Sequence, residues 1–370
     1  MSQPRPHCSP VTEPHKDTTF YQPIYQAVIR EMERVTNPLP DANQPDNTGK
    51  VGLFTVLPAH QWMKQANARP IPQMLFGELW FESELCILFA DTNLGKSILA
   101  VQIGNSISTG VAIPGFQLQA QKQPVLYFDF ELSDKQFEAR YSLDYEQHYA
   151  FDENFLRAEI NPDSTLPDSF KTFEDFLSYS LELAIVEKKV KVLIIDNLTY
   201  LRNDNERAKD ALPLMKHLKA LKSRYGLSIL CLAHTPKRDL SKPITRNDLQ
   251  GSKMLINFCD ACFAIGESTQ DKQIRYIKQI KERSTPKLYG DDNVVMFQLT
   301  KPFNFLQFEF LGYGSEYDHL RQQTEQDKAN RLKEVLDMKK QGLSNVAIAQ
   351  KLNVSEGAVR KWLRKEEVKL

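Results

Sequence analysis

The chain has 370 residues, of which 41% are hydrophobic and 25% are charged, a composition ordinary for a globular protein of about two domains. Lysine plus arginine equals aspartate plus glutamate at 47 each, so the formal net charge is zero. A neutral chain is not a basic nucleic-acid coat, and any contact with DNA must come from a local patch.

The cysteines and the apolar runs exclude further classes of protein. Five cysteines with scattered spacing do not form a disulfide framework. Cys259 and Cys262 make a C-x-x-C without a second pair, which favours packed apolar residues over a zinc or redox site. No signal peptide opens the chain and no apolar run is long enough to span a bilayer, so we expect a cytoplasmic protein without membrane contact.

Residues 1–67 are expected to form a largely disordered N-terminal arm. Residues 1–50 contain eight of the twenty prolines, with many polar residues between them. One stretch, 21–35, has apolar residues at helical spacing and predicts a short helix. That helix would dock on the core or on a neighbouring subunit, and the sequence does not decide between the two.

Residues 68–312 alternate strand-like and helical patterns, which predicts an α/β core with a mostly parallel sheet between helices. The expected strands and helices are, in chain order, strand 85–90, helix 97–108, strand 125–130, a helix from 134, helix 170–187, strand 192–195, helix 208–225 and strand 227–233. Strands 262–265, 273–280, 294–299 and 306–310 follow with little helix, which predicts an antiparallel extension at one edge. Residues 313–328 are polar and are expected to be a linker.

A P-loop motif lies between the first strand and the first helix of this core, where such a motif belongs. Its backbone N–H groups would point at the phosphates of ATP, the Lys96 ammonium would contact the β- and γ-phosphates, and the Ser97 hydroxyl would bind Mg²⁺. The usual first glycine is Ala90 here, which fits if that residue keeps a negative φ. The nucleotide-binding residues are Ala90, Asp91, Thr92, Asn93, Leu94, Gly95, Lys96 and Ser97.

The strand at 192–195 is followed by Asp196, as in a Walker B strand, and this carboxylate would hold Mg²⁺ together with Ser97. The next residue is not glutamate, so the base that activates water must come from elsewhere. Glu131 follows the neighbouring strand and is the candidate; Asp129 competes with it, and a solvated acid is the alternative. His234, at the end of strand 227–233, would bind the γ-phosphate. The alternative is that its ring nitrogens only form hydrogen bonds with backbone groups.

These motifs, in this order, resemble RecA-fold ATPases, and most closely the hexameric helicases of the replicative DnaB type and the plasmid RepA type. The similarity covers roughly residues 70–310 and includes Arg69-Pro-Ile-Pro before the core. The segment 242–252, followed by Asp260-Ala261, is similar to the DnaB-type loop that touches single-stranded DNA. The chain has no room for the large N-terminal domain of the DnaB type, so its loading partners are not implied.

The resemblance implies a ring, expected to have six subunits, with single-stranded DNA in its channel. It implies that Gln250, Gly251, Ser252 and Lys253 line that channel. It also implies that Lys281 and Arg283 match the Lys-x-Arg finger, which reaches the γ-phosphate of the adjacent subunit. Independently, one loop carries four cations that suit phosphate contacts or form a solvated basic loop: Lys237, Arg238, Lys242 and Arg246.

Residues 329–370 form the last predicted unit, with ten lysines and arginines against five acids. The pattern from 342 to 363 resembles helix-turn-helix modules of the resolvase and regulator type, in which a basic helix enters the major groove of duplex DNA. Arg360, Lys361 and Arg364 lie on the outward face of that helix. A small helical bundle that binds protein is the alternative.

Together these features predict an ATP-hydrolysing DNA-binding protein that assembles into homo-oligomers. The leading hypothesis is a hexameric replication helicase of a plasmid, phage or other mobile element. The alternative is an ATP-switched regulator, loader or transposition factor without unwinding activity. A small-molecule kinase shares the P-loop but needs neither the helix-turn-helix nor the Lys-x-Arg pair, and it ranks below both.

Overall fold

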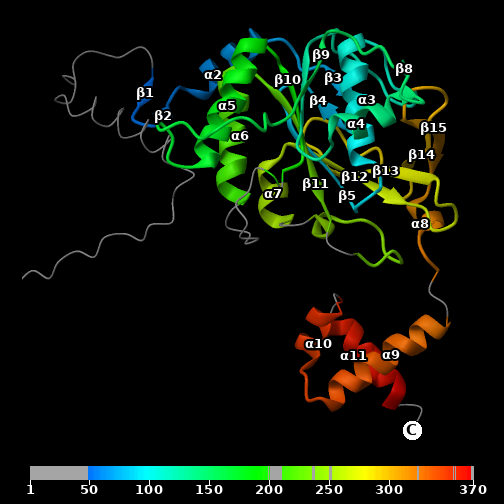
Figure 1. Cartoon of the computed structure of the whole chain (residues 1–370). Coiled ribbons are helices and arrows are strands. Elements are labelled where there is room, and N and C mark those ends of the chain that lie inside the picture. Colours follow the sequence, from blue (N-terminus) through cyan, green and yellow to red (C-terminus); the bar gives the residue numbers. More distant parts are fainter. Residues whose placement is uncertain are drawn as a thin grey trace, which may run out of the picture.

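The computed structural model describes residues 49–198, 200, 211–235, 238–249, 252–322, 325–352, 354 and 356–367. An α/β core occupies most of this part of the chain, and a group of three helices follows it (Figure 1). In the described ranges, no helix is long and apolar enough to cross a membrane.

The core is built on a nine-stranded sheet with the strand order β15-β14-β13-β12-β5-β11-β10-β6-β9. Six neighbouring strands are parallel: β12 (Ala261–Glu267), β5 (Leu85–Ala90), β11 (Ser228–His234), β10 (Val192–Asp196), β6 (Val125–Asp129) and β9 (Phe155–Ala158). Three antiparallel strands extend one edge: β13 (Ile274–Lys281), β14 (Val294–Thr300) and β15 (Gln307–Gly314). The predicted α/β class and its antiparallel extension are confirmed, while β9 was not expected.

Helices cover both faces of the sheet, so strands such as β5 are buried along their whole length. One face carries α3 (Lys96–Thr109) and the hairpin of β3 (Met74–Phe76) and β4 (Trp80–Phe81). The other face carries α5 (Phe173–Lys188), α6 (Ala211–Tyr225) and α7 (Ser252–Phe258). Between β6 and β9 lie α4 (Asp134–Arg140) and a small hairpin of β7 (Ser142–Leu143) and β8 (Gln147–His148).

The N-terminal arm is more ordered near the core than the prediction for residues 1–67 allowed. A turn joins β1 (Lys50–Val51) to β2 (Phe54–Thr55), and α2 (Ala59–Asn67) follows. Gly52 supplies a positive φ of 55° in that turn, and Pro58 precedes the first turn of α2. The helix predicted at 21–35 lies outside the described residues.

The predicted linker at 313–328 is wrong for its first part. Strand β15 continues to Gly314, and α8 (Glu316–His319) then packs on the core. The Glu316 carboxylate is buried; it accepts a hydrogen bond from the Ile244 N–H at 2.6 Å and pairs with the buried Lys278 ammonium. Lys278 donates in turn to the Ile244 carbonyl at 2.7 Å. The polar composition predicted a linker, but the Glu316 charge is compensated inside the core.

Replacing Glu316 with alanine is expected to lower the free energy of unfolding by about 1–3 kcal/mol, because it leaves the buried Ile244 N–H without an acceptor and leaves Lys278 paired only with the partly exposed Asp291. Urea unfolding followed by circular dichroism measures this change. Glu309→Ala is the matched control, since Glu309 is exposed on β15 and its loss should change stability by less than about 0.5 kcal/mol. Equal midpoints for the two variants would contradict the expectation.

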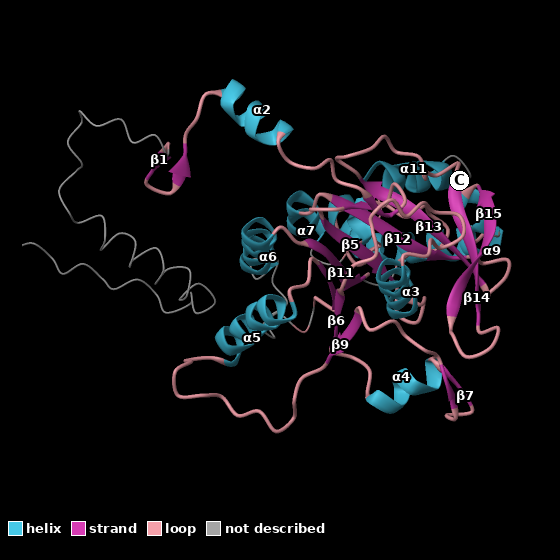
Figure 2. Cartoon of the chain, turned by 90° about the horizontal axis from the view of Figure 1, so that it is seen from above, coloured by secondary structure: helices cyan, strands magenta, loops and turns pink. Residues whose placement is uncertain are grey.

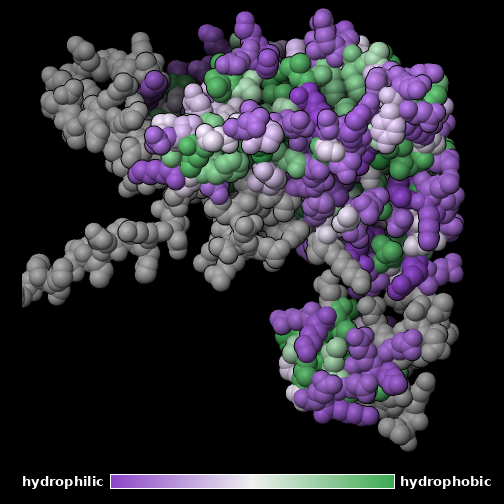
Figure 3. Space-filling model, in the orientation of Figure 1, coloured by the Kyte–Doolittle hydropathy of each residue, from purple (hydrophilic) through white to green (hydrophobic). Residues whose placement is uncertain are grey.

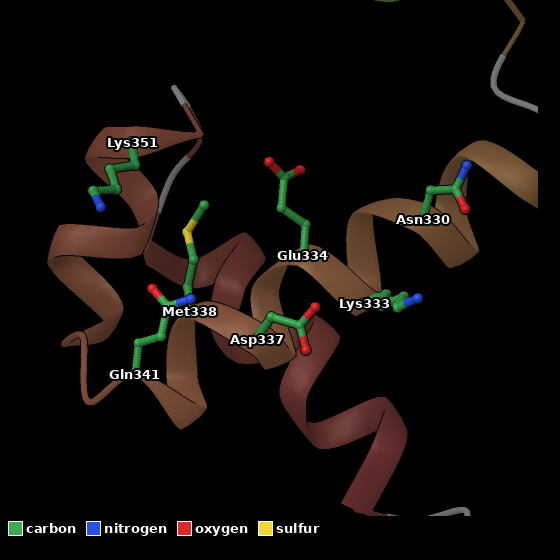
Figure 4. Close-up of a pocket in the computed structure, with 7 residues that line it drawn as sticks. All are labelled: Asn330, Lys333, Glu334, Asp337, Met338, Gln341 and Lys351. Atoms are coloured by element: carbon green, nitrogen blue, oxygen red, sulfur yellow. The ribbon is translucent and has the colours of Figure 1, made fainter.

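The last three helices are α9 (Glu325–Lys340), α10 (Asn345–Lys351) and α11 (Glu356–Glu367), and α9 begins before the predicted boundary at residue 329. The Ser344 hydroxyl accepts a hydrogen bond from the Ala347 N–H and caps α10. The helices enclose a small core of Val335, Ile348, Ala349 and Val359. Outside it, polar side chains of α9 line an open groove that Lys351 of α10 borders (Figure 4).

Candidate functional site

The P-loop connects the end of β5 to the start of α3. Asn93 and Gly95 both have positive φ, 64° and 91°, which curls the loop around the amino end of the helix. A side chain at residue 95 would meet the Phe308 ring of β15 at 2.9 Å, so glycine is required there. The loop therefore presents the open cradle of backbone N–H groups that binds phosphate.

Lys96 is held against the same loop. Its ammonium donates to the carbonyls of Ala90 at 3.1 Å and Asp91 at 3.0 Å. Burial lowers the pKa of Lys96, and the nearby carboxylates Asp196 and Glu131 oppose this effect. Ala90 itself ends β5 in a buried, extended conformation without positive φ, which shows how alanine is tolerated at the first position of the motif.

Asp196 ends β10 and lies inside the protein. Its Oδ2 accepts a hydrogen bond from the Tyr127 hydroxyl at 2.7 Å. Among the described residues, no hydrogen-bond partner is found for its buried Oδ1. Burial raises the pKa of Asp196 to about 6, and the neighbouring hydroxyls of Ser97 and Tyr127 oppose that rise. A buried carboxylate with an unused oxygen beside a hydroxyl is a donor set that suits Mg²⁺.

The structure separates the two acids that competed as the base. Asp129 is fully buried and its oxygens are occupied, because it accepts from the Arg157 Nε at 3.0 Å and from two backbone N–H groups. Glu131 is half-buried, and its Oε1 lies 3.3 Å from Nε2 of His234. That contact, with Lys96 and Asn197 nearby, lowers the pKa of Glu131. Glu131 is thus an ionised, accessible carboxylate, while Asp129 has a structural role.

Asn197 joins this cluster, although the sequence analysis noted only that the residue after Asp196 is not glutamate. Its carboxamide hydrogen-bonds Glu131 Oε1 and lies 3.0 Å from Nε2 of His234. Its position directly after the Walker B aspartate was the only signal. Tyr127 was also missed, because an aromatic residue inside a buried strand carries no functional signal in a sequence. Thr235 follows His234 with a buried hydroxyl for which the described residues supply no partner.

All these groups gather because four parallel strands end at the same edge of the sheet. Strands β5, β11, β10 and β6 are neighbours, and the register pairs His234 with Ala90 and Asp196 with Asp129. The carboxyl edge of such a sheet is where ligands bind in open α/β folds. A phosphate cradle, a buried carboxylate and an ionised glutamate at this edge define a P-loop nucleotide-binding protein.

A family model described as an AAA domain matches residues 55–239, half of the chain, and the chain belongs to this family of P-loop ATPases, which occurs in helicase-like proteins. No curated protein matches the chain. The matched segment includes the P-loop, Glu131, Asp196 and His234, and it ends before Lys281 and Arg283.

Lys281 and Arg283 do not join the cluster. The Lys281 ammonium donates to the carbonyls of Ile256 and Cys259 at the end of α7, and Arg283 pairs with Asp260 at 3.2 Å. Asp260 also accepts from the N–H of Leu85, the first residue of β5, at 3.0 Å. Both cations therefore lie near the amino end of β5, whereas the P-loop of the same chain follows the carboxyl end of that strand.

Only part of the predicted DNA-contacting set can be placed. Lys237, Gln250 and Gly251 lie outside the described residues, and Ser252 and Lys253 are placed only as the backbone of the first turn of α7. Arg238, Lys242 and Arg246 lie on the segment 238–249, where Arg246 is exposed and Lys242 pairs with Asp239 at 3.7 Å. On α11, Arg360, Lys361 and Arg364 are exposed, and Arg360 pairs with Glu356 at 2.7 Å.

Proposed function

We propose that the chain is an ATP-driven DNA motor, a ring-forming replication helicase of a plasmid, phage or other mobile element. One observation carries the proposal. The nucleotide site lies at the carboxyl ends of the parallel strands, and the exposed Arg283 lies near their amino ends. Each subunit of a head-to-tail ring would then complete the site of its neighbour.

The residues at the carboxyl edge fit MgATP. The P-loop N–H groups and Lys96 would hold the phosphates, while the Ser97 hydroxyl and the unused oxygen of Asp196 would hold Mg²⁺. Bound Mg²⁺ would neutralise charge that develops on the transferred phosphoryl group. Glu131 would orient the attacking water and accept its proton. Asn197 and His234 fix the Glu131 carboxylate in place, and His234 is the residue that would sense loss of the γ-phosphate.

Two basic surfaces support a DNA substrate. The segment 238–249 leads directly into α7 and bears Arg238, Lys242 and Arg246, which suits phosphate contacts with single-stranded DNA in a channel. The exposed cations of α11 suit contacts with duplex DNA, as in a helix-turn-helix module. The segment 238–249 is fixed to the core at Ile244. The Ile244 N–H donates a hydrogen bond to Glu316, and its carbonyl accepts one from Lys278.

A second candidate function is an ATP-switched DNA-binding protein without unwinding activity. The α9–α11 unit favours it, because that unit has its own hydrophobic core and an exposed basic helix that needs no motor to bind duplex DNA. In this case ATP would set the oligomeric state and the three helices would select the site.

Forked-DNA unwinding and binding to single strands separate the two candidates. The motor predicts unwinding that Lys96→Ala abolishes, and ATP turnover that single-stranded DNA stimulates. Lys242→Ala with Arg246→Ala should weaken single-strand binding and reduce the slope of log affinity against log salt by about 0.7 for each lost phosphate contact. Slow turnover that ignores single strands, with no unwinding on any fork, would favour the switch.

A further inference from the structure

The stretch of chain that leads to the last three helices is fixed to the core as far as Arg321. The N–H and the hydroxyl of Thr269 both donate to the His319 carbonyl, at 3.0 and 3.1 Å. The Arg321 N–H then donates to the Leu240 carbonyl at 3.0 Å. Leu240 belongs to the basic segment 238–249. The group of helices α9–α11 is therefore attached to the core at the segment that is proposed to contact single-stranded DNA.

The segment and this attachment are also bonded at a second point, where they share a charged surface. The Glu316 carboxylate of α8 accepts from the Ile244 N–H at 2.6 Å. Lys242 and Arg246 lie on either side of Ile244 in the sequence and are exposed, and Arg321 adds a third exposed cation. Because these bonds hold both stretches of chain against the core, the three cations keep their positions relative to one another.

The tether between this surface and the last three helices is short. Helix α9 begins at Glu325, four residues after Arg321, so the tether spans at most about 14 Å. Val335 packs with Val359 of α11, and it lies ten residues into α9, about 15 Å along the helix axis. With about 10 Å between packed helices, the middle of α11 stays within about 40 Å of Arg321. This distance equals about 12 base pairs of duplex DNA.

The last three helices form a lobe of their own within that reach. Figure 1 shows them below α8, and in the view from above they lie on the side of the sheet that is formed by β13, β14 and β15 (Figure 2). The visible face of the lobe is largely hydrophilic (Figure 3). Arg360, Lys361 and Arg364 of α11 are exposed on this lobe. A duplex held by α11 would therefore lie next to any strand that is held by the segment 238–249.

We propose that each chain binds a DNA junction, in which duplex on α11 continues directly as single strand on the segment 238–249. Once one part of such a DNA is bound, the short tether makes the second contact intramolecular, so the junction should bind about 10²–10⁴-fold more tightly than either part alone. The proposal rests on the two DNA-binding surfaces of the proposed function, but not on unwinding.

Fluorescence anisotropy of the full chain, with a non-hydrolysable ATP analogue, tests the junction. The probes are a labelled single strand, a labelled duplex, and the same two joined end to end. The joined DNA is expected to bind at least about 10²-fold more tightly than the better of its parts, and a mixture of the separate parts should show no gain. Lys242→Ala with Arg246→Ala should lower the junction affinity toward that of the duplex. Arg360→Ala with Lys361→Ala should lower it toward that of the single strand.

A longer tether tests the physical cause of the preference. Insertion of about 40 glycine and serine residues after Gln322 changes neither basic surface, and the sheet and the lobe each keep a hydrophobic core. The effective concentration falls with about the −3/2 power of tether length, so the junction affinity is expected to fall about 30-fold. The affinities for the separate single strand and duplex should stay native, and they serve as the internal control for folding.

The outcomes separate this proposal from the proposed function. The junction proposal is overturned, and DNA binding stands, if both parts bind but the joined DNA binds no more tightly than the better part. It is also overturned if the inserted tether leaves the preference unchanged. If neither part binds, both proposals fail together. A tether-dependent preference for the junction without unwinding on any fork would uphold the junction and reject the motor.

Discussion

Replacing Arg283 with alanine is expected to lower kcat for ATP hydrolysis by about 10³-fold or more, with little change in nucleotide affinity. Arg283 is 51% exposed and lies at the sheet edge opposite its own P-loop. In the proposed ring it would therefore act on the γ-phosphate bound by a neighbouring chain and stabilise charge in the transition state. Steady-state hydrolysis gives kcat, and titration with a fluorescent ATP analogue gives affinity.

Complementation makes this prediction specific to a site shared between chains. A Lys96→Ala chain keeps Arg283, and an Arg283→Ala chain keeps its P-loop. Rings assembled from both should regain activity that neither homogeneous ring has. Lys122→Ala is the matched control, because Lys122 is also a half-exposed cation paired with a carboxylate, Asp152 at 2.6 Å. Native kcat in the Arg283→Ala protein would exclude a role for Arg283 at the γ-phosphate of the neighbouring chain.

Glu131→Gln is expected to lower kcat by about 10²–10⁴-fold while ATP still binds. Glutamine keeps the size of the side chain and its bond to Asn197, but it cannot accept a proton from water. Rapid-quench measurement of a single turnover would show the loss in the chemical step. The variant should hold MgATP long enough for the bound nucleotide to be recovered unhydrolysed.

Asp129→Asn is the matched control for Glu131→Gln, since it removes the same charge two residues away. Asp129 is bonded to Arg157 and to the backbone of the turn, so its replacement should lower the unfolding temperature and leave kcat of the folded protein near native. The roles are reversed if folded Asp129→Asn protein is inactive and Glu131→Gln protein turns over normally.

Short-range patterns made most of the core predictable. An apolar run before the P-loop and one before Asp196 identify buried parallel strands without any knowledge of their neighbours. Strand β9 was missed because it has only four residues and Arg157 interrupts its apolar pattern. That arginine is compensated by Asp129, 28 residues earlier in the chain, and such a pair leaves no local signal.

The same reason explains why the choice of base stayed open at the site and why the linker prediction was wrong in part. The choice between Asp129 and Glu131 depends on which one Arg157 occupies, and adjacent acids look alike in a sequence. Glu316 fell in the expected linker because its partners, Lys278 and Ile244, lie 38 and 72 residues away in the chain. The P-loop lysine needed no distant partner to be recognised, since its function depends on the loop and helix that surround it.

The support of the P-loop by β15 sets an order of events during translation. Gln102 of α3 donates to the Phe308 carbonyl at 3.0 Å and accepts from the Phe308 N–H at 2.9 Å, and the two residues are 206 positions apart. At about 5–20 residues per second, the ribosome needs roughly 10–40 s to add Phe308 after it has added Gln102. Throughout that interval the nascent P-loop lacks the Phe308 side chain that lies against Gly95. The newly made protein therefore completes the support of its nucleotide site only after β15 has been synthesised.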